Sequence, residues 1–183
     1  MNKCAEKLLI GGFYLIKKYF FILLTVIFAV ISMTGCSMGP HYSFGFIDKT
    51  GTFVIEPQYD MAIIFNEGLA PVMRGAGEYG KWGFIDTSGQ MVIDFKYDKV
   101  RGFYEGLCPV RIGDDKSGKW SFINKNDISV IIGDYDDASV FADGLAPVKF
   151  VGSKSDKYGY IDLNGNIVIE PIFEIASIFS EDL

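Results

Sequence analysis

A single motif is written four times along this chain, with a constant spacing of 38 residues between copies. It consists of an aromatic residue, a small residue, a second aromatic residue, an isoleucine and then Asp or Asn, and its copies span residues 44–48, 82–86, 120–124 and 158–162. Phenylalanine recurs in a shared register at Phe65, Phe103, Phe141 and Phe179. A constant period of this length is typical of repeat architectures. We therefore expect residues 44–183 to form one domain of four repeats, the last of them incomplete.

Each repeat reads as short β-strands joined by tight turns. In the second repeat, Trp82 and Phe84 fall on one face of a strand, and a turn follows at residues 86–89. The Asp of that turn can accept hydrogen bonds from the backbone ahead of it, and Gly89 tolerates a positive φ. The spacing predicts a hairpin with a type I turn and a G1 bulge, followed by a second strand at residues 91–93.

The other strands of a repeat are expected to be short. Proline donates no ladder hydrogen bond, so Pro57 and Pro171 are expected to end the second strand of the first and fourth repeats. Apolar stretches at residues 61–65 and 69–73 predict a third and a fourth strand. Pro71 lies in the fourth stretch and favours a sheet edge or a bulge there.

The phrases that open and close each repeat carry a family resemblance. Three copies open with a related triplet, Lys81-Trp82-Gly83, Lys119-Trp120-Ser121 and Lys157-Tyr158-Gly159, and residues 67–72 read Glu-Gly-Leu-Ala-Pro-Val. These phrases resemble the WG repeat, also called the KWG repeat, of bacterial secreted and surface proteins. The resemblance covers residues 44–183 and implies an all-β repeat fold with no common enzymatic activity, used as an interaction scaffold.

Four repeats of this size are compatible with a propeller or with an open array. We favour an open, curved array of β-meander units, because four blades is the lower end of the propeller range. The fourth repeat also stops at Leu183, before its Ala-Pro-Val phrase, and residues 37–43 do not resemble the missing strand. We expect that last unit to lack a strand, to expose a sheet edge and to be the first to open in hydrogen exchange.

Residues 1–35 read as a leader and not as part of the folded domain. Basic residues precede a run of thirteen apolar or small residues at 19–31, which suits a secretory signal helix and is short for a membrane span. The run ends in Thr34-Gly35-Cys36, which resembles the lipobox of bacterial lipoproteins. The resemblance implies lipidation of Cys36, a linker at residues 36–43 and a location in the cell envelope outside the cytoplasm. The alternative is an uncleaved single-pass N-terminal anchor.

Charge and composition exclude several functions. After residue 35 the chain carries 13 Lys and Arg against 22 Asp and Glu, and such an acidic body repels nucleic acid. Three cysteines cannot form a disulfide framework, and a single histidine, His41, argues against a His-based metal site or catalytic triad. Cys4 lies in the leader. No catalytic constellation recurs, and no cofactor is expected.

Several residues have both a functional and a structural interpretation. Trp82 and Trp120 could stack on sugars, but the same position holds Phe44 and Tyr158, so we favour core packing. Asp162, Asn164 and Asn166 alternate like calcium ligands, but the other repeats have fewer oxygen donors there, so we favour a turn and no metal.

The acidic cluster at residues 134–137 and Cys108 also have two interpretations each. Asp134, Asp136 and Asp137 could hold a cation or a basic partner, but a solvated acidic loop is favoured. Cys108 stands where other repeats have Ala70 and Ala146, so we expect a small buried side chain.

Taken together, the sequence predicts a non-catalytic, lipid-anchored repeat protein that presents a β surface to a partner. The expected partner is a protein, and the alternative is a cell-wall glycan. An uncharacterised hydrolase with a pair of carboxylates is the catalytic alternative, and it requires two carboxylates about 5 to 10 Å apart in a cleft.

Overall fold

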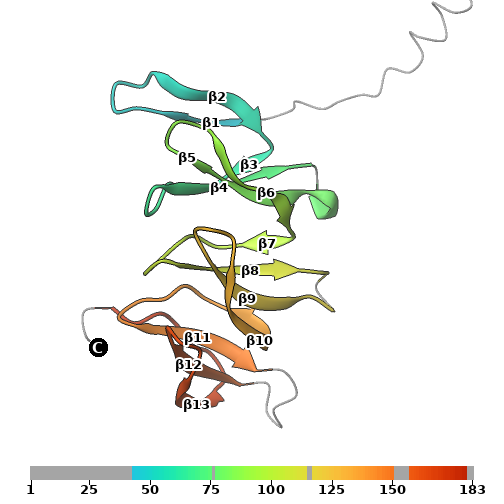
Figure 1. The fold of residues 1–183 in the computed structure, drawn as a ribbon, viewed down its shortest axis with the longest axis vertical. Coiled ribbons are helices and arrows are strands. Elements are labelled where there is room, and N and C mark those ends of the chain that lie inside the picture. The colour runs from blue at the N-terminus through green and yellow to red at the C-terminus, as the bar shows by residue number, and fades with distance from the viewer. Residues whose placement is uncertain (1–42, 76, 115–116, 151–156, 181–183) are drawn as a thin grey trace, which may run out of the picture. The chain divides into compact units, whose positions relative to one another are not determined.

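The computed structural model describes residues 43–75, 77–114, 117–150 and 157–180, which form an all-β array (Figure 1). The signal helix, Cys4, Cys36 and His41 lie outside these residues. A short 3₁₀ turn, η1, spans Gly77–Tyr79. The thirteen strands are β1 (Phe44–Ile47), β2 (Phe53–Tyr59), β3 (Met61–Ala62), β4 (Leu69–Arg74), β5 (Lys81–Asp86), β6 (Met91–Tyr97), β7 (Lys99–Val100), β8 (Leu107–Ile112), β9 (Lys119–Asn124), β10 (Ser129–Ala138), β11 (Leu145–Phe150), β12 (Tyr158–Asp162) and β13 (Ile167–Phe173).

The first hairpins of the first, second and fourth repeats have the turn that the sequence predicts, and in the third repeat Asp127 takes the place of the glycine with a φ of 64°. In the second repeat, Asp86 Oδ1 accepts hydrogen bonds from the N–H groups of Ser88 (2.8 Å) and Gln90 (3.0 Å). Gly89 follows with a φ of 83°, and its N–H donates to the carbonyl of Asp86 at 2.9 Å. The side chain of Asp86 therefore organises the turn, and glycine supplies the left-handed residue that closes it.

Gly89→Val is expected to lower the free energy of unfolding by at least about 1 kcal/mol, because a β-branched residue is strained at positive φ. A Cβ at this position would also lie 3.3 Å from Ile55 Cγ1 in the first repeat. Ser88→Ala removes only an exposed hydrogen bond to Asp86 and serves as the control. Urea denaturation compares the two variants, and equal losses would contradict the turn assignment.

Pro57 and Pro171 do not end their strands, which corrects the sequence-based prediction. β2 continues to Tyr59 and β13 to Phe173. On β1 and β2, Phe44 lies opposite Tyr59 and Phe46 lies opposite Ile55. An advance of two residues along β1 therefore corresponds to four residues along β2. The extra residues form a bulge, in which a residue without an N–H leaves no ladder hydrogen bond unmade.

The sheets do not coincide with the sequence repeats. The four-stranded sheet β3-β4-β5-β6 takes two strands from the first repeat and two from the second. The strands from β7 to β13 form one seven-stranded sheet, in the order β13-β12-β11-β10-β9-β8-β7, with strands from the second, third and fourth repeats. The long strand β10 pairs with β9 on one side and β11 on the other, and Tyr135 lies opposite Trp120 of β9 and opposite Phe150 of β11. The last two strands of each repeat thus pair with the first two strands of the next.

Because strands of one repeat pair with strands of the next, the expectations for two strands change. β4, which carries Pro71, lies inside its sheet between β3 and β5 and not at an edge. Its outer neighbour β3 has only two residues, and Pro71 faces the chain just beyond it, where Ile63 N–H donates to the Pro71 carbonyl. β12, in the fourth repeat, pairs on both sides, with β11 and with β13. Residues 175–176, which correspond to β3 and β7, form no strand, and Ile175 is 87% exposed, in line with the expected uncovered end of the fourth repeat.

The core is a series of layers between successive sheets. An isoleucine from the first strand of each later repeat is fully buried against the preceding repeat: Ile85, Ile123 and Ile161 are each 0% exposed. Ile85, for example, packs with Ile55, Tyr59 and Val72. Figure 1 shows the strands following one another in chain order, and no described strand of the first repeat pairs with one of the fourth. The described array is therefore open and not a closed propeller.

Candidate functional site

Two cavities occupy equivalent places along the array. The first, of about 1120 Å³, includes Met61, Met73, Trp82, Asp98 and Lys99 in its lining. The second, of about 530 Å³, is lined at the corresponding positions, 38 residues further on, by Lys99, Arg111, Trp120, Asp136 and Asp137. Trp82 and Lys99 belong to both linings. The two cavities are thus adjacent copies of one groove feature.

The two cavities differ in chemistry although they share their architecture. The first has two methionines in its wall and the exposed side chains of Tyr79 and Ile112, which are 89% and 62% exposed, at its border, although Lys81, Asp98, Lys99 and Asp114 also line it. We call it the apolar cavity. In the second, Lys99 and Arg111 replace the methionines, and Arg101 is added to the wall. We call it the charged cavity. The pair is suited to bind a ligand that is apolar in one part and charged in another.

A lysine–carboxylate pair anchors the wall of each cavity. Lys81 Nζ lies 2.5 Å from Asp98 Oδ1 beside the apolar cavity, and Lys119 Nζ lies 2.5 Å from Asp136 Oδ1 beside the charged one. The fourth repeat has the same pair, Lys157 with Glu174, at 3.0 Å. The Lys of the Lys-Trp-Gly triplet therefore ties the first strand of a repeat to the end of its second strand. Sequence reasoning had assigned no role to this lysine.

Arg101 organises the charged cavity. Its Nε donates to the carbonyl of Ala138 at 2.7 Å, and its Nη2 lies 3.1 Å from Asp137 Oδ1. The guanidinium also lies over the ring of Trp120, 5.2 Å from the ring centroid. Tyr158 donates its hydroxyl hydrogen to the other carboxylate oxygen of Asp137 at 2.9 Å. Residues of three successive repeats are joined in this network, which fixes the shape of the cavity.

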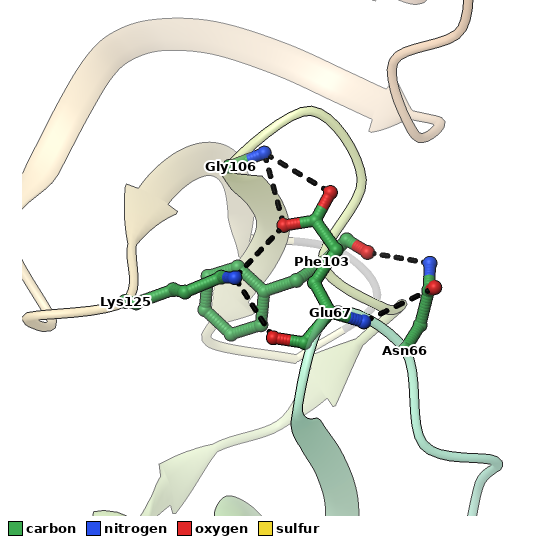
Figure 2. Close-up of polar contacts among 5 residues, drawn as sticks. All are labelled: Asn66, Glu67, Phe103, Gly106 and Lys125. Carbon is green, nitrogen blue, oxygen red and sulfur yellow. Dashed lines mark hydrogen bonds and ion pairs between the residues drawn. The ribbon is translucent and has the colours of Figure 1, made fainter.

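A second set of polar contacts links the turns of successive repeats (Figure 2). The Glu67 carboxylate accepts two hydrogen bonds from Gly106 N–H, at 3.2 and 3.3 Å. Lys125, from the third repeat, donates to the Glu67 carbonyl at 2.8 Å and lies 3.1 Å from its carboxylate. Glu105 repeats the first contact with Gly144 N–H at 3.1 and 3.2 Å. Because each turn contacts the next, these carboxylates have a structural role.

Acid is expected to weaken the Glu67 contact. Burial acts to raise the pKa of this carboxyl, but the hydrogen bonds from Lys125 and Gly106 outweigh it, and the pKa lies below that of an ordinary glutamate. A carboxyl with a lowered pKa in the folded state stabilises the fold above its unfolded-state pKa of about 4.3, and this contribution is lost as the pH falls through the folded-state pKa. Glu67→Gln should therefore cost about 1 kcal/mol at pH 7 and much less at pH 3. Urea denaturation at both pH values tests this, with the exposed Glu170→Gln as control; equal losses at both pH values would contradict it.

The structure places the tryptophans in the walls between repeats. Trp120 is 5% exposed and packs with the core, as the sequence predicted. Trp82 is half-buried, packs against the core and also lines both cavities. Cys108 is fully buried, and burial raises the pKa of its thiol, so it acts as a small apolar side chain.

The two acidic clusters are occupied by internal contacts. Asp162 Oδ1 accepts hydrogen bonds from the N–H groups of Asn164 and Asn166, in agreement with the turn interpretation. Asp136 and Asp137 lie on β10 and not in the solvated loop that we expected. The physical reason is two neighbouring cations, Lys119 on β9 and Arg101 just after β7, which pair with these carboxylates and hold them in the sheet.

The two carboxylates of the charged cavity, Asp136 and Asp137, form ion pairs with Lys119 and Arg101. Among the described residues no three His, Cys, Asp or Glu side chains are grouped as metal ligands. No helix within the described ranges has the length and apolarity to cross a membrane.

Sequence reasoning missed the cations of the charged cavity. Lys99, Arg101 and Arg111 occupy the positions of Met61, Ile63 and Met73 in the first repeat. A signal was present, because the third repeat also has charged residues, Asp137 and Lys149, at the positions of Met61 and Met73, so these are not shared core positions.

Comparison with known proteins agrees with the repeat geometry. The profile of the family described as "WG containing repeat" matches residues 44–77, 82–120, 120–154 and 158–183. No curated protein and no solved structure matches the chain. The four matches cover most of the chain and follow the 38-residue period on which the hairpins, the buried isoleucines and the cavities recur. The chain therefore belongs to the WG-repeat family.

Proposed function

We propose that this protein is a non-catalytic scaffold, lipid-anchored outside the cytoplasm, that binds a protein partner along the apolar and charged cavities. The observation that carries the binding role is the substitution of Lys99 and Arg111 for Met61 and Met73 at equivalent wall positions. The third repeat has Asp137 and Lys149 at the same two positions, so the residues there vary from one repeat to the next. Two methionines in one wall and two cations in the next give adjacent cavities with different ligand preferences.

The supporting context is the way in which these walls are held. Trp82 separates the two cavities, and the pairs Lys81–Asp98 and Lys119–Asp136 fix the strands around them. Walls that are already ordered before binding reduce the loss of conformational entropy that binding entails. A flat spacer without a ligand would have no need of them.

Site-specific photo-crosslinking in intact cells tests the binding role. A photoreactive residue at Ile112, which lines the apolar cavity, should crosslink to one discrete protein. Val130, which is 48% exposed and lines neither cavity, is the control. Met61→Glu in the opposite wall should abolish the Ile112 crosslink by placing a charge in an apolar site. Identical products at both positions, or a crosslink insensitive to Met61→Glu, would refute the proposed site, and attachment to glycan alone would favour a cell-wall ligand.

The anchor is tested separately. Cys36→Ala is expected to abolish both lipidation and signal cleavage, because the thiol is the acceptor of the lipid. The intact mass of protein extracted from membranes decides this, with Ser37→Ala as a neighbouring control that should be processed normally. A full-length wild-type chain, or an unmodified mature chain that begins elsewhere, would contradict the lipoprotein assignment.

A further inference from the structure

The first strand of the array has an edge that its equivalents do not have. β5, β9 and β12 each pair on both sides, with the last strand of the preceding repeat and with their own hairpin partner. Among the described residues, β1 pairs only with β2. The β1–β2 hairpin is therefore half of a sheet whose other half is supplied, everywhere else in the array, by a preceding repeat.

Two side chains of β1 are correspondingly exposed to solvent. Ile47 is 59% exposed, whereas its equivalents Ile85, Ile123 and Ile161 are 0% exposed. Phe44 is 44% exposed, whereas its equivalent Trp120 is buried and Trp82 and Tyr158 are partly buried. The isoleucine that is core in the other three repeats is thus solvent-facing on β1.

The array itself shows which strand fills this position. In three places the strand beside β5, β9 or β12 reads Leu, a small residue, Pro and Val, at residues 69–72, 107–110 and 145–148. The small residue lies opposite the buried isoleucine each time: Ala70↔Ile85, Cys108↔Ile123 and Ala146↔Ile161. These small residues are 0% exposed, so a larger side chain would not fit against the isoleucine.

Proline is compatible with this pairing for a local reason. Pro71 lies opposite Phe84, but its carbonyl accepts from Ile63 N–H on the other side of the strand. The nitrogen and the carbonyl of one residue point to the same side of a strand, so the missing N–H faces away from β5. A Leu-Ala-Pro-Val strand therefore makes its ladder with β5 intact.

We propose that the free edge of β1 is a docking site for an extended strand of a partner protein with the pattern Leu, small residue, Pro, Val. By the register of the three internal copies, the small residue lies opposite Ile47, the proline opposite Phe46 and the valine opposite Gly45. This is strand addition to a sheet edge, in which the backbone supplies affinity and the side chains supply the register. The site is separate from the two cavities, so it extends the proposed function.

A second copy of this chain is not the expected donor. Its three strands with this pattern, β4, β8 and β11, are each paired within their own sheets. Donation would require one of those sheets to open. The partner must instead bring a strand with this pattern that is not already paired.

A synthetic peptide with the sequence of residues 69–74, Leu-Ala-Pro-Val-Met-Arg, is the probe, and the full-length chain in detergent is the target. Hydrogen exchange is followed at residues 44–47 and, for comparison, at 82–85. The peptide should slow exchange at residues 44–47 at least about tenfold and leave 82–85 unchanged. The same peptide with Ala70→Glu and Val72→Asp is the matched control and should have no effect.

Ile47→Glu provides the second arm of the test. Because this residue is exposed, the variant should fold, lose binding of the labelled peptide at least about tenfold and keep the Ile112 crosslink of the cavity. Equal binding of both peptides, binding unaffected by Ile47→Glu, or amides at 44–47 that are already as protected as those at 82–85 without peptide would overturn the proposal. Absence of a crosslink at Ile112 in the otherwise unchanged chain would refute the role of the cavities only. Failure of the strand-docking proposal can therefore be told apart from failure of the proposed function.

Discussion

Ile85→Ala is expected to lower the free energy of unfolding by about 2–5 kcal/mol, because it removes a fully buried side chain from the layer between the first two repeats. Ile85 is 0% exposed and packs with Ile55, Tyr59, Ala70 and Val72. Deleting it forfeits its transfer free energy and leaves a cavity that two sheets cannot close without moving.

Ile47→Ala is the matched control, since it makes the same chemical change at the same position of the repeat. Ile47 is 59% exposed, and its truncation should cost no more than about 0.5 kcal/mol. Chemical denaturation at low protein concentration gives both values. Similar losses for the two variants would mean that the preceding repeat does not complete the core of the next.

Gly83→Ala is expected to lower the free energy of unfolding by about 1–3 kcal/mol, a large loss for the addition of one carbon. A Cβ at this position would lie 2.5 Å from the Ile93 carbonyl oxygen and 3.0 Å from the Asp94 carbonyl carbon, where the hairpin partner bulges inward. The obstacle is backbone and cannot rotate away. The glycine that gives the repeat its name is thus required by close approach of two strands.

The third repeat contains its own control for that prediction. Ser121 stands at the equivalent position, and there the register differs: Ser121 pairs directly with Ile132, and the bulge is displaced to the residues before Tyr135. Ser121→Ala should therefore change stability by less than about 0.5 kcal/mol. Thermal or urea unfolding of both variants provides the measurement. If Gly83→Ala proved as mild as Ser121→Ala, close strand approach would not explain the glycine.

The repeat and its hairpins were predictable because their signals are local. Asp86 and Gly89 define a turn through contacts within five residues, and the alternation of Trp82 and Phe84 defines the strand before it. The prediction that Pro57 ends its strand was wrong because it rested on local sequence alone. The effect of a proline on a strand depends on whether the opposite strand needs its N–H, and a bulge removes that need.

The sequence repeat does not predict which strands of successive repeats join in one sheet. A periodic sequence has no marked beginning, so four strands per period can be divided into sheets in several ways. The pairing of β4 with β5 joins different repeats, and the sequence of either strand does not reveal it. The cavities were missed for the same reason, because Lys99, Arg111 and Trp120 reach one wall only through this pairing.

Hydrogen exchange of the backbone amides tests most directly whether the first strand of each later repeat pairs with the last strand of the repeat before it. If it does, the amides of β12, which pairs on both sides, should be protected like those of β5, and those of β1, which pairs on one side, should exchange fastest of the three. The opposite order, with β1 as protected as β5 and β12 opening first, would contradict this account. That order is expected if each sequence repeat formed its own sheet and the fourth were left without its last strand.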